Sequence, residues 1–229
     1  MINSSQHGLI LDAESTLLAG ECLDLLGNRL GVGNEIEAMT ARAMVDGWDF
    51  GRSLEERVSI LIQKGLHRDD LEAVAHSLQP APSVAAHRDW FAAHADRYLV
   101  MSGGFEQCID RSLAALGIPL DQRYANRFII DEVTGLVTGF DRQNLLSKAG
   151  GKALLIQNLG LNPEKLTAVG DGKNDQLIKL RGMAKFFGLY IEVTGAKKRA
   201  DLVKDPETDK VFENFSQVVN YLQEMSPAA

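Results

Sequence analysis

Four short apolar runs, separated by much longer amphipathic stretches, constrain the fold of this chain more than any other feature. Each run is typical of a buried β-strand, and together they cover Gly8–Leu11, Tyr98–Met101, Thr167–Val169 and Leu189–Val193. Between the runs, apolar residues recur at helical spacing, as at Leu155, Ile156 and Leu159. Strands that alternate with helices predict an α/β fold, with a Rossmann-like parallel-sheet core and helices on both faces of the sheet.

One region breaks this alternation. Residues 22 to 80 contain several helical patterns and no strand pattern, and the region ends at "LQPAPS", where two prolines mark a boundary. We therefore expect a small helical cap domain, residues 21–80, inserted after the first strand and lying over the carboxyl end of the sheet. Residues 1–20 and 81–229 would form the core domain. A β-hairpin is expected in "RFIIDEVTGLVTGFD", around a turn that contains Thr134-Gly135.

The composition is that of an ordinary globular protein of one or two domains, with 229 residues, 45% hydrophobic and 24% charged. A net charge of −7 argues against nucleic acid as a partner, although a few cations could still form a pocket for a small anion. No apolar run approaches the ~18 residues of a membrane span, and no signal peptide is evident. Cys22 and Cys108 are typical of buried thiols in a reducing compartment, so we expect a cytoplasmic location without a membrane partner.

Polar residues follow three of the predicted strands at the point where each strand ends. These stretches are Asp12-Ala13-Glu14-Ser15-Thr16, Ser102-Gly103-Gly104 and Gly170-Asp171-Gly172-Lys173-Asn174-Asp175. Any one of them alone could be a helix cap, a tight turn or a polar loop. The carboxyl ends of parallel strands lie at one edge of a sheet, however, and ligands bind there. Their occurrence at three strand ends therefore indicates a functional site.

The residue types at these strand ends suit phosphoryl transfer. Hard oxygen ligands for Mg²⁺ could come from three carboxylates, those of Asp12, Asp171 and Asp175. Ser102 and the backbone amides around Gly103 could hold phosphate oxygens. A lysine is needed to offset the charge on the transferring group, and "SKAGGKALL" supplies Lys148 and Lys152. We favour Lys152 because it opens a predicted helix, but the pattern alone does not decide between the two.

The same residues resemble the motifs of the haloacid dehalogenase superfamily of aspartate-nucleophile phosphatases. The motifs are Asp12-x-Glu14-x-Thr16, Ser102-Gly103-Gly104, Lys152 and Gly170-Asp171-Gly172-x-Asn174-Asp175. Within the superfamily the chain is most similar to the phosphoserine phosphatase family, through "AESTLLAGECLDLLG", "AMVDGWDFGRSLEERVSIL", "MSGGFEQCID" and "YANRF". The resemblance covers residues 7 to 182 and fades over the longer and more charged stretch 183–213.

The resemblance implies a mechanism for a small phosphorylated metabolite, with O-phosphoserine favoured. Asp12 would be the nucleophile and form an aspartyl-phosphate, Glu14 the general acid and base, and Lys152 the phosphate lysine. The resemblance also assigns Mg²⁺ to Asp12, Asp171 and the backbone carbonyl of Glu14, with Asp175 acting indirectly.

The implied binding residues fall into two groups. Phosphate would be held by Ser102, Gly103 and Asn174. The amino-acid part of the substrate would be bound by a second group, in which Glu21 contacts the ammonium, Arg57 contacts the carboxylate, and Met44 and Phe50 line the pocket. The sequence makes no prediction of the oligomeric state.

Glu14 departs from the family pattern, which has aspartate at this position. The extra methylene displaces the carboxyl by about 1 Å, and such a misplacement can cost about 10²-fold in rate. The pocket could be adjusted to glutamate. Alternatively the chain could be a slow enzyme, or a phosphatase or phosphotransferase for another small phosphorylated metabolite, or it could bind a phosphorylated ligand without turnover. The basic run "GAKKRAD", residues 195–201, is open to two interpretations, a solvated loop or a contact to a second phosphate or a partner.

Overall fold

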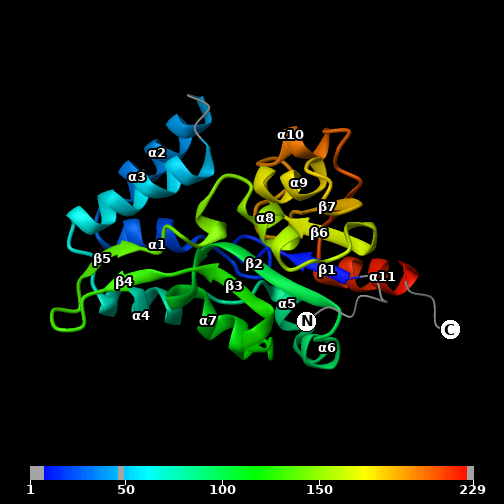
Figure 1. Ribbon diagram of the computed structural model, residues 1–229, viewed down its shortest axis with the longest axis horizontal. Helices are drawn as coiled ribbons and strands as arrows, with labels where there is room; N and C mark the ends of the chain where they lie inside the picture. The colour runs from blue at the N-terminus through cyan, green and yellow to red at the C-terminus, as the bar shows by residue number, and fades with distance from the viewer. Residues whose placement is uncertain (1–7, 46–48, 226–229) are drawn as a thin grey trace.

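The structure is a computed structural model that describes residues 8–45 and 49–225, apart from the side chains of residues 40–45. Its centre is a six-stranded sheet with the strand order β3-β2-β1-β6-β7-β8 (Figure 1). All neighbouring strands in this sheet are parallel, which confirms the predicted α/β class. The strands are β1 (Gly8–Leu11), β2 (Tyr98–Phe105), β3 (Arg123–Asn126), β6 (Leu166–Gly170), β7 (Phe186–Tyr190) and β8 (Lys210–Phe212).

The two faces of the sheet carry separate apolar clusters, because successive side chains of a strand point to opposite faces. Leu9 and Leu11 of β1 belong to one cluster, and Ile10 belongs to the other. The first cluster includes buried residues of α5 (Pro82–Ala85), α6 (Arg88–Ala93), α7 (Glu106–Ala115) and α11 (Phe215–Met225). The second includes those of α8 (Gly151–Asn158), α9 (Lys173–Leu180) and α10 (Ala200–Val203). The central strands are therefore buried on both faces, as continuous apolar runs predict.

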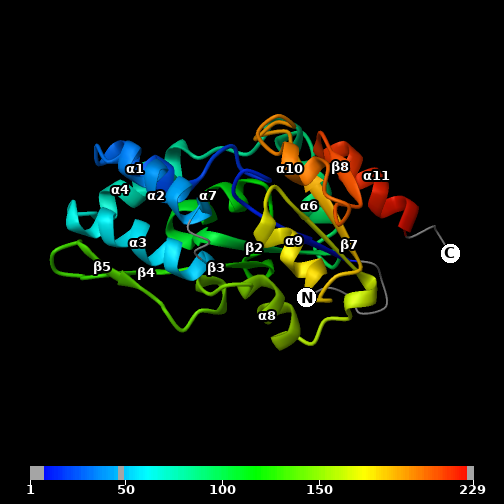
Figure 2. The same cartoon turned by 90° about the horizontal axis from the view of Figure 1, so that it is seen from above.

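Six described helices lie between β1 and β2 in the chain, and the first four of them form the insert that precedes Pro80, namely α1 (Cys22–Arg29), α2 (Gly33–Val45), α3 (Phe50–Gln63) and α4 (Arg68–Ser77). The helical insert after the first strand is thus as expected, whereas its division from the core as a domain of residues 21–80 stays a prediction. Figure 2 shows these helices at one end of the molecule and α11 at the other. Within the described residues, none of the helices has the length and apolar character that a bilayer span requires.

The chain enters and leaves this helical insert at one place. Leu18, before the insert, forms a bridge with Pro80, after it. Two backbone hydrogen bonds flank the bridge, from Ala19 N to Gln79 O at 2.8 Å and from Ala81 N to Leu17 O at 2.9 Å. The two segments that connect the insert to the rest of the chain are therefore hydrogen-bonded to each other.

A predicted hairpin, β4 (Phe128–Ile130) with β5 (Val137–Phe140), lies beside the inserted helices (Figure 1). Gly135 in its turn has φ +75°, which glycine adopts without strain. The His67 ring, at the start of α4, reaches this turn, with Nε2 3.0 Å from the carbonyl oxygen of Thr134. Val137 N also donates to Leu66 O at 2.8 Å. The hairpin thus connects the insert to the core.

Some strand positions differ from the sequence prediction. The strand predicted at Leu189–Val193 is β7 at Phe186–Tyr190, because the apolar run already begins at Phe186 and pairing with β6 and β8 selects its earlier part. Gly188 within it takes no side chain, since a Cβ there would overlap the ring of Phe212. β2 extends to Phe105, four residues beyond its prediction. β3 and β8 were not predicted, because they are short sheet-edge strands with polar residues and no apolar pattern.

Candidate active site

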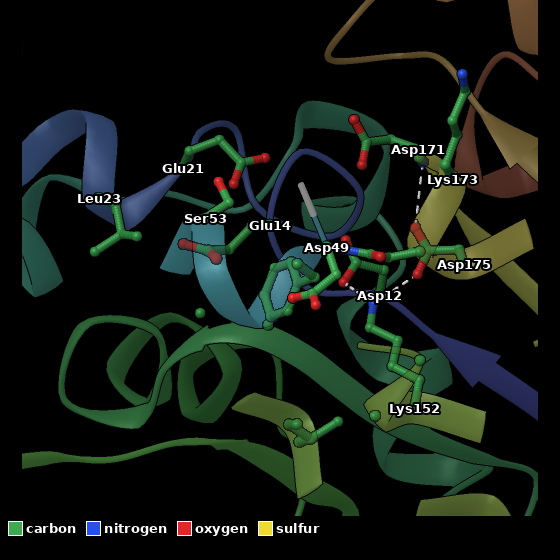
Figure 3. Close-up of a pocket in the computed structure, with 18 of the residues that line it drawn as sticks. Asp12, Glu14, Glu21, Leu23, Asp49, Ser53, Lys152, Asp171, Lys173 and Asp175 are labelled. Carbon is green, nitrogen blue, oxygen red and sulfur yellow. Dashed lines mark hydrogen bonds and ion pairs between the residues drawn. The ribbon is translucent and has the colours of Figure 1, made fainter. Parts of the chain in front are cut away.

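A cavity of about 630 Å³ opens at the carboxyl ends of β1, β2 and β6 (Figure 3). Its walls include most of the residues expected in the site. The side chains and glycines that matter below are Asp12, Glu14, Glu21, Phe50, Arg57, Gly103, Gly104, Lys152, Asp171, Asn174 and Asp175. Asp12 and Asp171, which are 159 positions apart in the chain, therefore meet at one edge of the sheet, as the strand-end pattern predicted.

Three buried carboxylates form the centre of the cavity. Asp12 follows β1, Asp171 follows β6, and Asp175 lies in the first turn of α9. One oxygen from each lies within 4.8 Å of the others, and hard oxygen donors at this spacing fit a divalent cation such as Mg²⁺. Gly170 makes the approach possible, because a Cβ at this position would overlap the carboxyl group of Asp175. Asp175 also accepts a hydrogen bond from Gly172 N at 3.2 Å.

Lys152 joins two of these carboxylates. Its Nζ donates to Asp12 Oδ1 and, at 2.6 Å, to Asp175 Oδ1 (Figure 3). Burial acts to lower the pKa of Lys152, but the two carboxylates outweigh it and raise this pKa. Burial raises the pKa of Asp12 to about 7, against the opposing effect of Lys152. Lys148 lines the same cavity but is exposed, so the lysine in contact with the carboxylates is Lys152.

Asp171 has a different counter-ion, Arg199, which sequence reasoning did not place in the site. Nη2 of Arg199 donates to Asp171 Oδ2. Burial raises the pKa of Asp171 to about 7, and the positive charge of Arg199 opposes this shift. Arg199 and Lys198 belong to the basic run "GAKKRAD", and both line the cavity. The run therefore contributes to the cavity wall. Its positive charge on an acidic chain was the only feature of the sequence that could have pointed to Arg199 as a site residue.

Glu14 lies in the loop after β1, and its carboxyl group is buried. Oε1 accepts a hydrogen bond from Cys22 N at 2.5 Å. Burial is the main reason that the pKa of Glu14 is raised well above its usual value, so the protonated acid is favoured. Gly104 packs against this carboxyl group, and a Cβ there would overlap Oε2. A glycine near the end of β2 thus leaves room for the longer acidic side chain.

The wall on the side of the inserted helices holds the other expected recognition residues. Glu21 accepts a hydrogen bond from Ser15 Oγ at 2.7 Å, and burial raises its pKa to about 8. The ring of Phe50 covers Gly103, and Arg57 lines the cavity with its Nε donating to Ser53 O at 3.2 Å. Met44 lies in α2, but its side chain falls outside the described residues.

This wall also holds two polar residues that sequence reasoning missed, Asp49 and Ser53. Asp49 caps the start of α3 by accepting a hydrogen bond from Arg52 N at 2.9 Å, and Ser53 lies one turn further on. An aspartate before a predicted helix was the only available signal, and it is also the signal of an ordinary helix cap.

Of the three residues expected to contact phosphate, two line the cavity and one does not. Gly103 and Asn174 line the cavity. Ser102 is fully buried behind them, where its Oγ accepts a hydrogen bond from Gly104 N at 3.0 Å. The carbonyl oxygen of Gly103 is held by Asn126 Nδ2 at 2.8 Å. The last part of β2, at Ser102, Gly103 and Gly104, is thus fixed from both sides, and Ser102 supports it without lining the described cavity.

Parallel strands whose carboxyl ends bring three buried carboxylates together with a buried lysine define an enzyme of the α/β class with an aspartate at the centre of its site. The family model described as haloacid dehalogenase-like hydrolase matches residues 9–177 of the chain. This chain belongs to that family. Its similarity to phosphoserine phosphatases identifies it as a phosphoric monoester hydrolase.

Two phosphoserine phosphatases similar to this chain support this placement. A phosphoserine phosphatase of Streptococcus thermophilus is 33% identical over 184 residues, which are 78% of this chain and 82% of that protein. A phosphoserine phosphatase of Archaeoglobus fulgidus is 32% identical over 180 residues, or 77% of this chain, which spans only half the length of that relative.

Solved structures show the same fold. A phospho-aspartyl intermediate analogue of phosphoserine phosphatase has a TM-score of 0.72 and 24% identity, with 94% of this chain and 98% of that chain covered. A phosphoserine phosphohydrolase-like protein from Francisella tularensis has a TM-score of 0.76 and 21% identity, covering 94% and 99% of the two chains.

Proposed function

We propose that this protein hydrolyses small phosphate monoesters, with O-phosphoserine as the favoured substrate, in a reaction that depends on Mg²⁺. The single observation that carries the proposal is the contact of Lys152 with Asp12 and Asp175 inside a buried cluster of carboxylates. A buried lysine that neutralises a carboxylate at a strand end is the arrangement that a nucleophilic aspartate and an incoming phosphate require.

The cation site would consist of Asp12, Asp171 and the backbone carbonyl of Glu14, with Asp175 acting through an intervening group. A bound Mg²⁺ would offset negative charge on the phosphate. Asp175 and Asp12 share Lys152, so the same lysine orients both carboxylates. The phosphate oxygens would be bound by backbone amides at Gly103, by Asn174 and by Lys152, while Ser102 holds the turn or contacts phosphate directly.

The reaction has two chemical steps. First, a carboxylate oxygen of Asp12 attacks phosphorus and the bond to the ester oxygen breaks, while Glu14 gives its proton to the departing oxygen. The raised pKa of Glu14 supplies the protonated acid that this step needs. Then water attacks the phosphorus of the aspartyl-phosphate, Glu14 takes a proton from the water, and phosphate leaves with Asp12 restored.

The opposite wall of the cavity would bind the amino-acid part of the substrate. The Arg57 guanidinium suits a carboxylate, and the Glu21 carboxylate suits an ammonium group. Phe50 and Met44 would line the space between them. Binding of the ammonium would favour the charged form of Glu21, whose pKa burial raises to about 8.

The test is the steady-state release of phosphate from O-phosphoserine with and without Mg²⁺. We expect turnover that requires Mg²⁺ and that is lost in Asp12→Asn. A panel of phosphorylated metabolites then separates the favoured substrate from a second candidate, a phosphatase or phosphotransferase for another small metabolite. The presence of Glu14 at the acid position is what favours this candidate. Binding of phosphoserine without turnover of any phosphomonoester would replace the proposal with a phospholigand-binding protein.

A cytoplasmic location and a core domain of residues 1–20 and 81–229 remain parts of this proposal. Two free, buried thiols, Cys22 and Cys108, support a reducing compartment. Net negative charge supports the absence of a nucleic-acid partner.

A further inference from the structure

Arg199 is the part of the site that the family motifs do not include. It lies between β7 and α10, in the stretch over which the family resemblance fades, and its side chain enters the cavity. Its Nη2 pairs with Asp171 Oδ2, and the side chain is 21% exposed, against 9% for Asp171. The guanidinium thus pairs with a carboxylate that the proposed function assigns to the catalytic cation.

The contact between Arg199 and Asp171 involves only one nitrogen of the guanidinium group. Arginine binds a carboxylate best through two parallel hydrogen bonds. Here Nη2 is the donor, while Nε of Arg199 is buried and has no hydrogen-bond partner. A buried donor left unsatisfied weakens the net benefit of the pair. The geometry is therefore that of a counter-ion that another cation can displace.

The charges of the cluster lead to the same conclusion. Three buried carboxylates, Asp12, Asp171 and Asp175, face two cationic side chains, Lys152 and Arg199. With all three carboxylates ionised, the form that binds a cation, the cluster carries one net negative charge, and it would carry two without Arg199. A divalent cation is attracted less by the first arrangement than by the second, and its repulsion from a guanidinium a few ångströms away adds to the difference.

We propose that Arg199 is a built-in counter-ion that competes with the divalent cation for Asp171 and thereby lowers the affinity of the site for Mg²⁺. This inference rests on the proposed function, because it takes the three carboxylates as the cation site. It makes Arg199 a positioning residue, which acts on the cation through Asp171.

The experiment measures Mg²⁺ binding to the purified protein without substrate by isothermal titration calorimetry. Arg199→Met removes the charge and keeps an unbranched side chain. Lys198→Met is the matched control, because Lys198 is the neighbouring cation in the cavity wall and its loss changes the net charge equally. We expect Arg199→Met to bind Mg²⁺ about tenfold or more tightly than the unmodified protein, and Lys198→Met to bind it within about threefold.

Two further variants keep the outcome decisive. Arg199→Gln repeats the loss of charge with a polar side chain, in case Arg199→Met does not fold, and Arg199→Lys should retain most of the weak affinity. Unchanged or weaker Mg²⁺ binding in both neutral variants overturns the inference, as does equal tightening in Lys198→Met. The metal assignment itself is tested by Asp171→Asn. If that variant binds Mg²⁺ as the unmodified protein does, or if the unmodified protein binds none, the cation site of the proposed function fails and the inference fails with it.

A thermal-unfolding measurement gives a second readout that does not depend on catalysis. In Arg199→Met the carboxylate of Asp171 loses its counter-ion, so the midpoint without Mg²⁺ should be lower than in the unmodified protein. Saturating Mg²⁺ should then raise the midpoint by more than it does in the unmodified protein, because a ligand stabilises a fold in proportion to the logarithm of its concentration over its Kd. An equal rise in both proteins contradicts the inference.

Discussion

The two walls of the cavity are built in different ways. On the core side, Asp12, Asp175 and Lys152 are buried and hold one another through ion pairs between three separate elements (Figure 3). On the side of the inserted helices, Glu21 and Arg57 have local partners, Ser15 and Ser53, four to six residues away in the chain. The reacting groups are thus fixed by the tertiary fold, whereas the recognition groups depend on local structure and can change with fewer consequences for the sheet.

The largest expected effect comes from the core wall. Lys152→Met leaves Asp12 and Asp175 buried without their shared cation, and losing one such electrostatic contact typically costs about 10²–10³-fold in kcat. A buried pair that loses one partner also destabilises the fold, here by about 3 kcal/mol. Steady-state kinetics and urea unfolding measure both. Lys148→Met, which removes an exposed lysine of the same cavity, should change neither by a comparable amount, and a larger effect there would reverse the choice between the two lysines.

Between the walls, the contact of Glu14 with Gly104 is expected to have the next largest effect. Gly104→Ala adds a methyl group that overlaps the carboxyl of Glu14, and a displacement of about 1 Å can lower kcat by about 10²-fold. Glu14→Asp alone should also lower kcat if the pocket is built for glutamate. The shorter aspartate should recover part of the loss when it is combined with Gly104→Ala.

The double-mutant cycle distinguishes packing from chemistry at this position. Strictly additive losses in the double variant would mean that Gly104 does not set the position of Glu14. A large gain in kcat for Glu14→Asp alone would mean that the natural glutamate compromises the enzyme.

A smaller and more selective effect is expected from the wall of recognition residues. Arg57→Ala removes the proposed partner of the substrate carboxylate, so KM for O-phosphoserine should rise by about tenfold to a hundredfold. KM for p-nitrophenyl phosphate, which has no carboxylate, should change by less than about threefold. Equal changes for both substrates would argue against an amino-acid substrate and would leave the phosphatase chemistry untouched.

The smallest effect concerns Glu21 and the dependence of stability on pH. Burial raises the pKa of Glu21 from 4.5 to about 8 in the folded protein. Between these two values the folded form keeps a proton that the unfolded form releases, so the free energy of unfolding falls as pH rises through this window. Glu21→Gln should flatten this fall by on the order of 1–2 kcal/mol in urea unfolding at pH 5 and pH 8. An identical pH profile in the variant would show that Glu21 is not the group responsible.

The sequence predicted the parts of the molecule that depend on local pattern. The central strands β1, β2 and β6 have apolar runs that end in polar residues, and this pattern was sufficient to predict that Asp12 and Asp171 lie close together. The edge strands β3 and β8 have no such pattern, because a short strand with one open side needs few apolar residues. The shift of β7 to Phe186–Tyr190 was decided by pairing with its neighbours, which a run of apolar residues alone does not encode.

Within the site, the contacts that the sequence did not show join distant segments of the chain. Gly104 and Glu14 lie 90 residues apart, and only the folded chain shows that one makes room for the other. Arg199 reaches Asp171 across 28 residues and from a different loop. Its basic run was visible in the sequence, but charge alone did not distinguish a solvated loop from a wall of the cavity.

The bridge between Leu18 and Pro80 has a consequence for how this protein can be rebuilt. The bridge holds the point where the chain leaves the core beside the point where it returns. The four inserted helices are therefore attached to the core through two adjacent segments of backbone. An exchanged insert would therefore begin and end at two neighbouring positions, and it would have to cover the same apolar surface of the core that the present helices cover. Recombination at this bridge would exchange Glu21, Phe50 and Arg57 together, whereas Asp12, Lys152, Asp171 and Asp175 lie outside the exchanged segment. A new insert would also have to supply the backbone donor that Cys22 gives to Glu14.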